Sequence, residues 1–224
     1  AIVADALAME TYESTQEMLV AWEEQELGEM LKASGKYDAT YWVCAFCVNQ
    51  HAGICNRPAL KDSQGFPLKP CSCRTQKHFS GPASEMNKFD AMMAFLKKET
   101  RQRSFREKLP QRFGQVVAVD VNFVILTRVW CIAELAEAHR SHIPQVLKVH
   151  SASSHSSCSE TLQALDVRDA QASFPEDKDL VLSKIDDVEG FNAAVKSLLF
   201  YKFRPFLSKW GADPVEILLD ELLN

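Results

Sequence analysis

The 224-residue chain is 46% apolar and 25% charged, and it holds 8 glycines and 9 prolines. This composition suits one globular domain, alone or with an appendage, and excludes a disordered chain. The formal net charge of −5 argues against general nucleic-acid binding, and the sequence has no run of about 18 apolar residues that would predict a membrane span.

The first third of the chain predicts a helix, a strand and a long loop. Residues 5–33 place Leu19, Trp22 and Met30 on one helical face and glutamates on the other. The charge-free run TYWVCAFCV over 40–48 is typical of a strand buried on both faces. Glycine and proline are spread through residues 52–84 and indicate a loop.

Strands and helices alternate in the rest of the chain. We predict strands at 115–121, 143–150 and 161–167, and helices at 85–108, 128–141 and 190–203. Capping patterns at Ser173 and Asp213 predict two more helix starts. This alternation predicts an α/β fold of three layers, in which helices cover both faces of a parallel sheet.

The stretch VVAVDVNFVILTRVWCIAELAEA, residues 116–138, points to a family. A buried strand is followed by Asn122-Phe123 and then by WCIAEL, which opens a helix. This arrangement resembles the Toll/interleukin-1 receptor (TIR) domain family, where NY and then WCxxEL follow a strand. The spacing between the two matches is longer here than in the family.

YWVCAFCVNQH, residues 41–51, resembles the VWxDxxCxNQ strand of TIR-like proteins from protists, with Cys44 in place of the aspartate. The resemblance implies a flavodoxin-like sheet that lacks its first strand, because residues 1–20 look helical. We therefore expect an N-terminal helical segment (1–36), a TIR-like domain (37–200) that contains the Cys/Pro-rich loop 52–84, and a C-terminal helical extension (201–224).

Glu134 has two interpretations. In catalytic TIR domains the glutamate of WCxxEL helps to cleave NAD. The resemblance implies the same role for Glu134, and Trp130 and Asn122 would then contact the dinucleotide. A carboxylate can stabilise the oxocarbenium-like transition state of such a cleavage. Alternatively, WCxxEL only packs a helix on the sheet. The absence of a first strand and of a glycine-rich phosphate loop from the sequence favours packing, and we expect no cofactor.

Charge is segregated along the chain. Residues 1–40 hold nine acids and two bases, whereas residues 57–112 hold thirteen bases and five acids. The basic residues Arg101, Arg103, Arg106 and Lys108 either face acidic parts of the same chain or dock an acidic protein partner. We expect a non-catalytic TIR-like interaction module that acts as an adaptor or accessory subunit of a larger assembly. NAD hydrolase and docking subunit of an organellar complex are the alternatives.

The seven cysteines are an odd number and indicate thiols in a reducing compartment. Because the chain starts with Ala1, a targeting segment was removed or an upstream part is missing, so cytoplasm and organellar stroma both remain open. We expect no metal. The alternative is a zinc site of Cys44, Cys47, Cys71 and Cys73, in a pattern that also contains His51 and His78, but cysteines three apart on a strand point to opposite faces.

Overall fold

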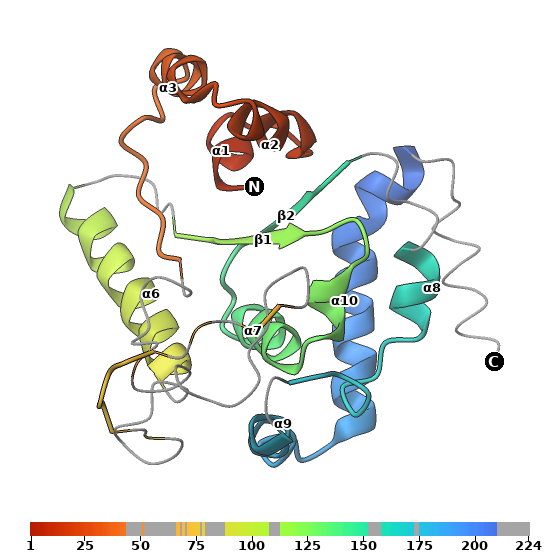
Figure 1. Cartoon of the computed structure of the whole chain (residues 1–224). Helices are drawn as coiled ribbons and strands as arrows, with labels where there is room; N and C mark the ends of the chain where they lie inside the picture. Colours follow the sequence, from red (N-terminus) through yellow and green to blue (C-terminus); the bar gives the residue numbers. More distant parts are fainter. Residues whose placement is uncertain are drawn as a thin grey trace. The chain divides into compact units, whose positions relative to one another are not determined.

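A computed structural model of the chain describes residues 1–43, 51, 66–67, 69, 71–76, 78, 88–107, 113–151, 158–172 and 175–209. The chain divides into two units. We call residues 1–39 and 113–224 the sheet unit and residues 40–112 the second unit (Figure 1). The boundaries that the sequence suggests at residues 36 and 200 stay a prediction.

The sheet of the described residues has two parallel strands. β1 (Gln115–Val119) pairs with β2 (Gln145–Val149), with Val117 opposite Leu147. Helix α7 (Val129–Arg140) lies between them in the sequence, so the three elements form a βαβ unit. The strands at 115–121 and 143–150 and the helix at 128–141 are thus confirmed. The described residues fit the α/β class with a small parallel sheet.

The strand predicted at 161–167 is wrong. Residues 158–163 form helix α8 (Cys158–Gln163), and the chain then continues without a strand. Leu162, near the end of α8, and Leu165, just beyond it, are both buried in the core. The backbone N–H of Val167 is satisfied by the side chain of Asn192, 3.0 Å away, instead of by a neighbouring strand.

Several predicted elements fall partly or wholly outside the described residues. Tyr41, Trp42 and Val43 belong to no strand, and the rest of the strand predicted at 40–48 is not described. Most of the loop at 52–84 and the helix start at Asp213 also lie outside the described residues. The second unit contains α6 (Lys88–Glu107), which confirms the helix predicted at 85–108.

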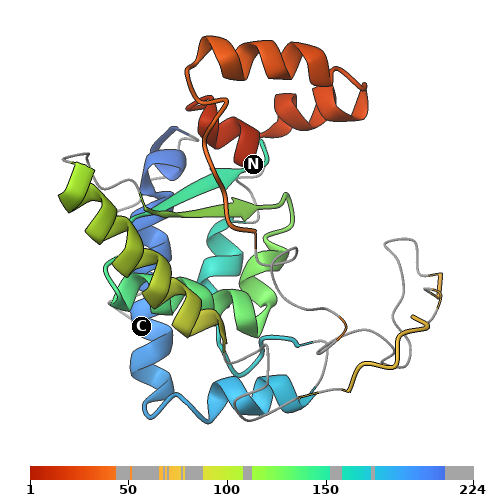
Figure 2. The same ribbon diagram turned by 90° about the vertical axis from the view of Figure 1, so that its left-hand side faces the viewer.

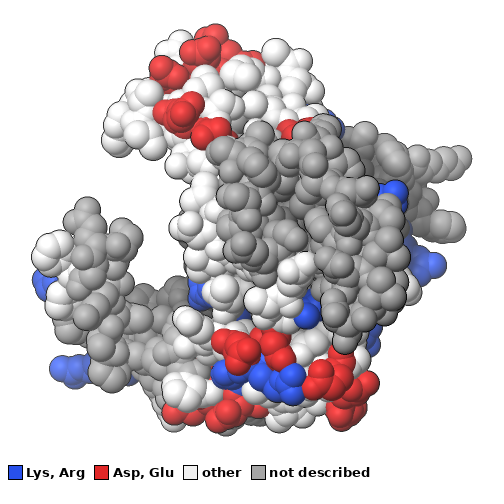
Figure 3. Space-filling view, turned by 90° about the vertical axis from the view of Figure 1, so that its right-hand side faces the viewer, with Lys and Arg blue, Asp and Glu red and all other residues white. Residues whose placement is uncertain are grey.

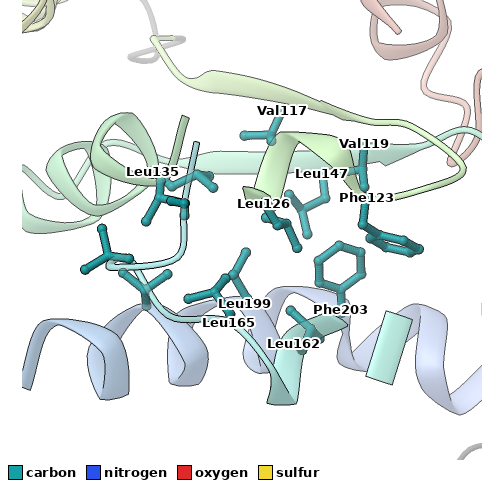
Figure 4. Close-up of a cluster of buried hydrophobic side chains, with 14 of the residues drawn as sticks. Val117, Val119, Phe123, Leu126, Leu135, Leu147, Leu162, Leu165, Leu199 and Phe203 are labelled. Atoms are coloured by element: carbon teal, nitrogen blue, oxygen red, sulfur yellow. The ribbon is translucent and has the colours of Figure 1, made fainter. Parts of the chain in front are cut away.

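One face of the sheet packs on a continuous apolar core. Val117 and Val119 of β1 and Leu147 of β2 point toward α10 (Val188–Lys209), which supplies Leu199 and Phe203 (Figure 4). Two further elements add side chains to this core: the 3-10 helix η2 (Val124–Thr127) and helix α9 (Pro175–Leu182). None of the helices among the described residues has the length and apolar character needed to cross a bilayer.

A buried glutamine joins four elements beneath the sheet. The Gln145 amide donates to Gln115 Oε1 at 2.8 Å and to the Leu135 carbonyl at 3.0 Å. Lys202 of α10 donates to the Gln145 carbonyl at 2.9 Å. Because unpaired polar groups are costly when buried, these bonds fix the two strands against α7 and α10.

The N-terminal region forms three helices instead of the single one predicted at 5–33. These are α1 (Ile2–Ala6), α2 (Glu13–Val20) and α3 (Glu24–Ala33). Ala8 and Trp22 have φ values of 57° and 60°, in the left-handed region, which ends a helix. The helices gather on the side of the strands away from α7 and α10 (Figures 1 and 2).

A buried lysine anchors α1 to the sheet. Lys148 of β2 is 6% exposed and points away from the apolar core. Its Nζ donates to the Met9 carbonyl at 2.6 Å and lies 3.4 Å from Asp5 Oδ1. The charge is therefore compensated inside the fold, as a buried cation requires.

An ionic cluster lies beside the start of α10. Arg168 contacts the Asp166 carboxylate and also Glu189, the latter at 2.8 Å. Through its hydrogen bonds Arg168 holds the pKa of Asp166 well below its usual range. Asp166 is thus ionised in the folded chain at pH values where the unfolded chain would bind a proton.

The cluster predicts an acid-dependent loss of stability. A depressed folded-state pKa stabilises the fold above the unfolded pKa of about 3.9. This contribution is lost progressively as the pH falls from that value toward the lower folded-state pKa. We expect Asp166→Asn to lower the free energy of unfolding at pH 7. The difference in this free energy between the wild type and the variant should become smaller as the pH falls from about 5 to about 2. Urea titrations across this range measure it. Arg168→Gln should remove the same pH-dependent part, and a difference independent of pH would contradict the assignment.

Candidate functional site

The WCIAEL motif opens α7, as the sequence predicts. The Trp130 side chain is partly buried and packs against the core beneath the sheet. Its indole N–H is buried and has no hydrogen-bond partner in the part of the chain that is described. Glu134, one turn further along, is partly buried. Trp130 therefore contributes to packing, and Glu134 occupies the position that the TIR resemblance would assign to catalysis.

Asn122 lies in the turn after β1, where Asp120 organises the backbone. The Asp120 carboxylate accepts hydrogen bonds from the N–H groups of Asn122, Val124 and Ile125, at 2.9, 3.2 and 3.3 Å. It thus satisfies the first two N–H groups of η2, whose N-cap residue is Phe123. Phe123 adopts φ 55° and is fully buried. The Asn122 side chain is exposed at this turn.

The carboxyl ends of both strands are covered by the segment between α1 and α2. Thr11 forms a parallel bridge with Val149, and the Tyr12 N–H lies 3.1 Å from the Val149 carbonyl. The Tyr12 hydroxyl donates to the Val119 carbonyl at 3.2 Å. Burial, and then the nearby Asp120, raise the pKa of Tyr12. In open α/β sheets ligands bind at this edge. Here Tyr12 donates hydrogen bonds to the Val119 and Val149 carbonyls at the edge.

His150, directly after β2, completes this edge. Its ring meets the Tyr12 ring edge-on, with centroids 5.2 Å apart. Its Nδ1 is buried without a hydrogen-bond partner among the residues that the structure describes. The sequence alone did not single out Tyr12, because its role depends on a contact between segments 107 residues apart. It did not single out Asp120 either, although the contacts of Asp120 are local.

The turn between α2 and α3 exposes a cluster of apolar side chains, which we call the hairpin tip (Leu19, Val20 and Trp22). Their side chains are 48%, 72% and 82% exposed. The prediction that Leu19 and Trp22 share one face of a single helix is therefore wrong. The chain turns at Trp22, so the helical periodicity of residues 5–33 does not continue through it. Only Leu27 of α3 and Thr15 of α2 are buried in these two helices.

Glutamates surround the hairpin tip. Glu17, Glu23, Glu24 and Glu26 are all exposed on α2, α3 and their connection. The space-filling view shows acidic side chains gathered over the N-terminal helices at the top (Figure 3). An apolar tip with an acidic border is complementary to an apolar groove that is bordered by Lys or Arg.

The predicted basic docking surface belongs to α6 of the second unit. Arg101 is exposed, as docking requires. Arg103 and Arg106 lie on the same helix, but their side chains are outside the described part of the chain, and Lys108 lies wholly outside it. The proposed surface is therefore described at Arg101 alone.

Two of the four predicted cysteine ligands meet a histidine. Cys71 and Cys73 lie near His51, and their ligand atoms are all within 4.8 Å of one another. The Cys71 sulfur is 3.4 Å from His51 Nδ1. Cys44 and Cys47 fall outside the described residues.

Comparisons with known proteins add no relative to this picture. No family model matches the chain, and neither a curated protein nor a solved structure matches it. The TIR resemblance thus continues to rest on residues 41–51 and 116–138.

Proposed function

We propose that the chain is a non-catalytic, TIR-like protein-interaction module that serves as an adaptor or accessory subunit of a larger assembly. We further propose that the fold is a flavodoxin-like sheet with helices on both faces, and that β1, α7 and β2 form the central part of it. We also propose that the protein works in a reducing compartment, because Cys71, Cys73 and Cys131 are thiols.

The observation that carries the proposal is the exposure and the left-handed backbone of Trp22. Its side chain is 82% exposed and its φ is 60°. A bulky residue in the left-handed region is strained, and burial of its ring does not offset the strain here. Such costs are typical of residues retained for binding, and tryptophan is enriched among the residues that dominate interface energies.

We propose that the hairpin tip inserts into an apolar groove of a partner protein bordered by basic side chains. The acidic border would speed association and orient the partner, whereas the tip would supply most of the affinity. The basic residues of α6 would bind a second, acidic surface, so the chain would offer two docking surfaces of opposite charge, as an adaptor requires. Arg101, Arg103, Arg106 and Lys108 are its proposed contacts.

The rival hypothesis is an NAD glycohydrolase that uses Glu134. We regard it as the weaker proposal because Tyr12 covers the strand ends where an α/β fold would receive a dinucleotide. Nicotinamide release from NAD that Glu134→Ala abolishes would contradict the non-catalytic part of our proposal.

Site-specific photo-crosslinking tests the docking surface. A benzophenone amino acid at position 22 should cross-link a protein partner in cell extract, and the cross-linked peptide should contain apolar residues flanked by Lys or Arg. The same probe at Tyr201, which is 72% exposed on α10, is the matched control. Cross-linking should weaken as salt screens the acidic border. Identical products from both positions, or cross-links only to further copies of the chain, would contradict the proposal.

Trp22→Gly separates binding from stability. Glycine adopts positive φ without strain but gains freedom in the unfolded chain. We therefore expect the free energy of unfolding to stay within about 1 kcal/mol of the wild type, while binding falls at least about tenfold. Urea unfolding and a pull-down of the cross-linked partner measure the two effects. Unchanged binding would contradict the proposal that the hairpin tip binds the partner.

A further inference from the structure

We propose that His51, Cys71 and Cys73 of the second unit bind a zinc ion. Each residue offers one ligand atom, and the three atoms lie within 4.8 Å of one another. Imidazole nitrogen and thiolate sulfur are the donors that zinc prefers in proteins. The donor set therefore selects zinc over magnesium or calcium, which require oxygen ligands.

The distance between the Cys71 and His51 ligand atoms is close to that expected at a tetrahedral zinc ion. Zn–S bonds of about 2.3 Å and Zn–N bonds of about 2.0–2.1 Å, at a tetrahedral angle, place sulfur and nitrogen about 3.6 Å apart. The Cys71 sulfur lies 3.4 Å from His51 Nδ1. A shared zinc ion would therefore need only a small adjustment of these side chains.

The two cysteines are arranged to act together. In Cys71-Ser72-Cys73 both cysteines are partly buried, whereas Ser72 is exposed, so the side chains alternate between two sides of the chain. Their ligand atoms lie within 4.8 Å of each other, so the single-residue spacing allows both to reach one ion. The Cys73 N–H also donates to the Cys71 sulfur at 3.4 Å.

The bound ion would join parts of the second unit that are 20 residues apart in sequence. Two thiolates and a neutral imidazole balance the two charges of the ion. Within the part of the chain that is described, the cluster has these three members, so one tetrahedral position is left for a further ligand. All three ligands belong to the pattern that the sequence offers for zinc, whereas Cys44 and Cys47 lie outside the described residues. It is independent of the proposed docking function.

Metal analysis of the purified full-length chain tests the site. We expect one zinc per chain after purification without chelators. The double variant Cys71→Ser/Cys73→Ser should bind zinc at least about 100-fold more weakly, since even changes to outer-sphere partners cost 10–100-fold. Cys131→Ser, which removes a partly buried thiol from α7, should leave the zinc content unchanged. Full zinc retention by the double variant would overturn the proposal.

Measurements on the wild-type chain keep the test valid if the double variant fails to fold. X-ray absorption at the zinc edge should show sulfur at about 2.3 Å and nitrogen at about 2.0–2.1 Å. Replacement by Co²⁺ should give the thiolate-to-cobalt charge-transfer absorption. Zinc surrounded by oxygen and nitrogen alone, or less than stoichiometric zinc from zinc-supplemented cells, would overturn the proposal.

Discussion

Phe203→Ala is expected to lower the free energy of unfolding by about 3–5 kcal/mol, which is the usual cost of removing a fully buried phenylalanine ring. The Phe203 side chain is completely buried on α10. Its ring lies 5.7 Å from that of Phe123 and 6.4 Å from that of Phe206. Because Phe123 follows β1, the Phe203 ring joins α10 to the segment after β1, and a cavity there would weaken the packing of both.

Urea unfolding followed by circular dichroism measures this effect as a lower midpoint with an unchanged slope. Tyr201→Ala is the matched control, because Tyr201 lies on the same helix and is 72% exposed. It should change the free energy of unfolding by less than about 0.5 kcal/mol. A Phe203→Ala effect below about 1 kcal/mol would mean that α10 does not pack on the sheet as described.

Lys148→Met is expected to lower the free energy of unfolding by about 2–3 kcal/mol. The substitution keeps the length of the side chain but leaves the Met9 carbonyl and the Asp5 carboxylate without their cation. Breaking a buried ion pair costs about 3–5 kcal/mol, but the Asp5 side chain is 24% exposed and regains part of its hydration.

Lys196→Met provides the control for this prediction. Lys196 Nζ also donates to a backbone carbonyl, that of Gln163 at 2.7 Å, but this bond is exposed to solvent. Its loss should therefore cost less than about 1 kcal/mol. Thermal or urea unfolding measures both variants, and equal effects would contradict the role that burial has in our argument.

The sequence predicts the elements whose periodicity is uninterrupted. β1, α7 and β2 follow from a β-branched run, a helical run and a second β-branched run, and each forms close to its predicted bounds. The prediction fails where tertiary contacts replace local pattern. Leu162 and Leu165 suit either a strand or a helix, and packing against α10 favours the helix.

The candidate surfaces were harder to predict than the sheet. Trp22 fits the apolar face of a helix, and only its left-handed φ places it at an exposed turn. An aromatic residue gives no local signal of such a backbone, unlike glycine or asparagine. The metal cluster joins His51 to cysteines 20 residues away, and a sequence without neighbours of known structure does not specify that contact.

The native mass of the protein, gently extracted from its own cells, tests the interaction account most directly. We expect the wild-type chain and Tyr201→Ala in an assembly larger than a single 224-residue chain and containing another protein, and Trp22→Gly at the mass of the single chain. A wild-type chain that runs alone, or a Trp22→Gly chain that remains in the same assembly, would contradict the account.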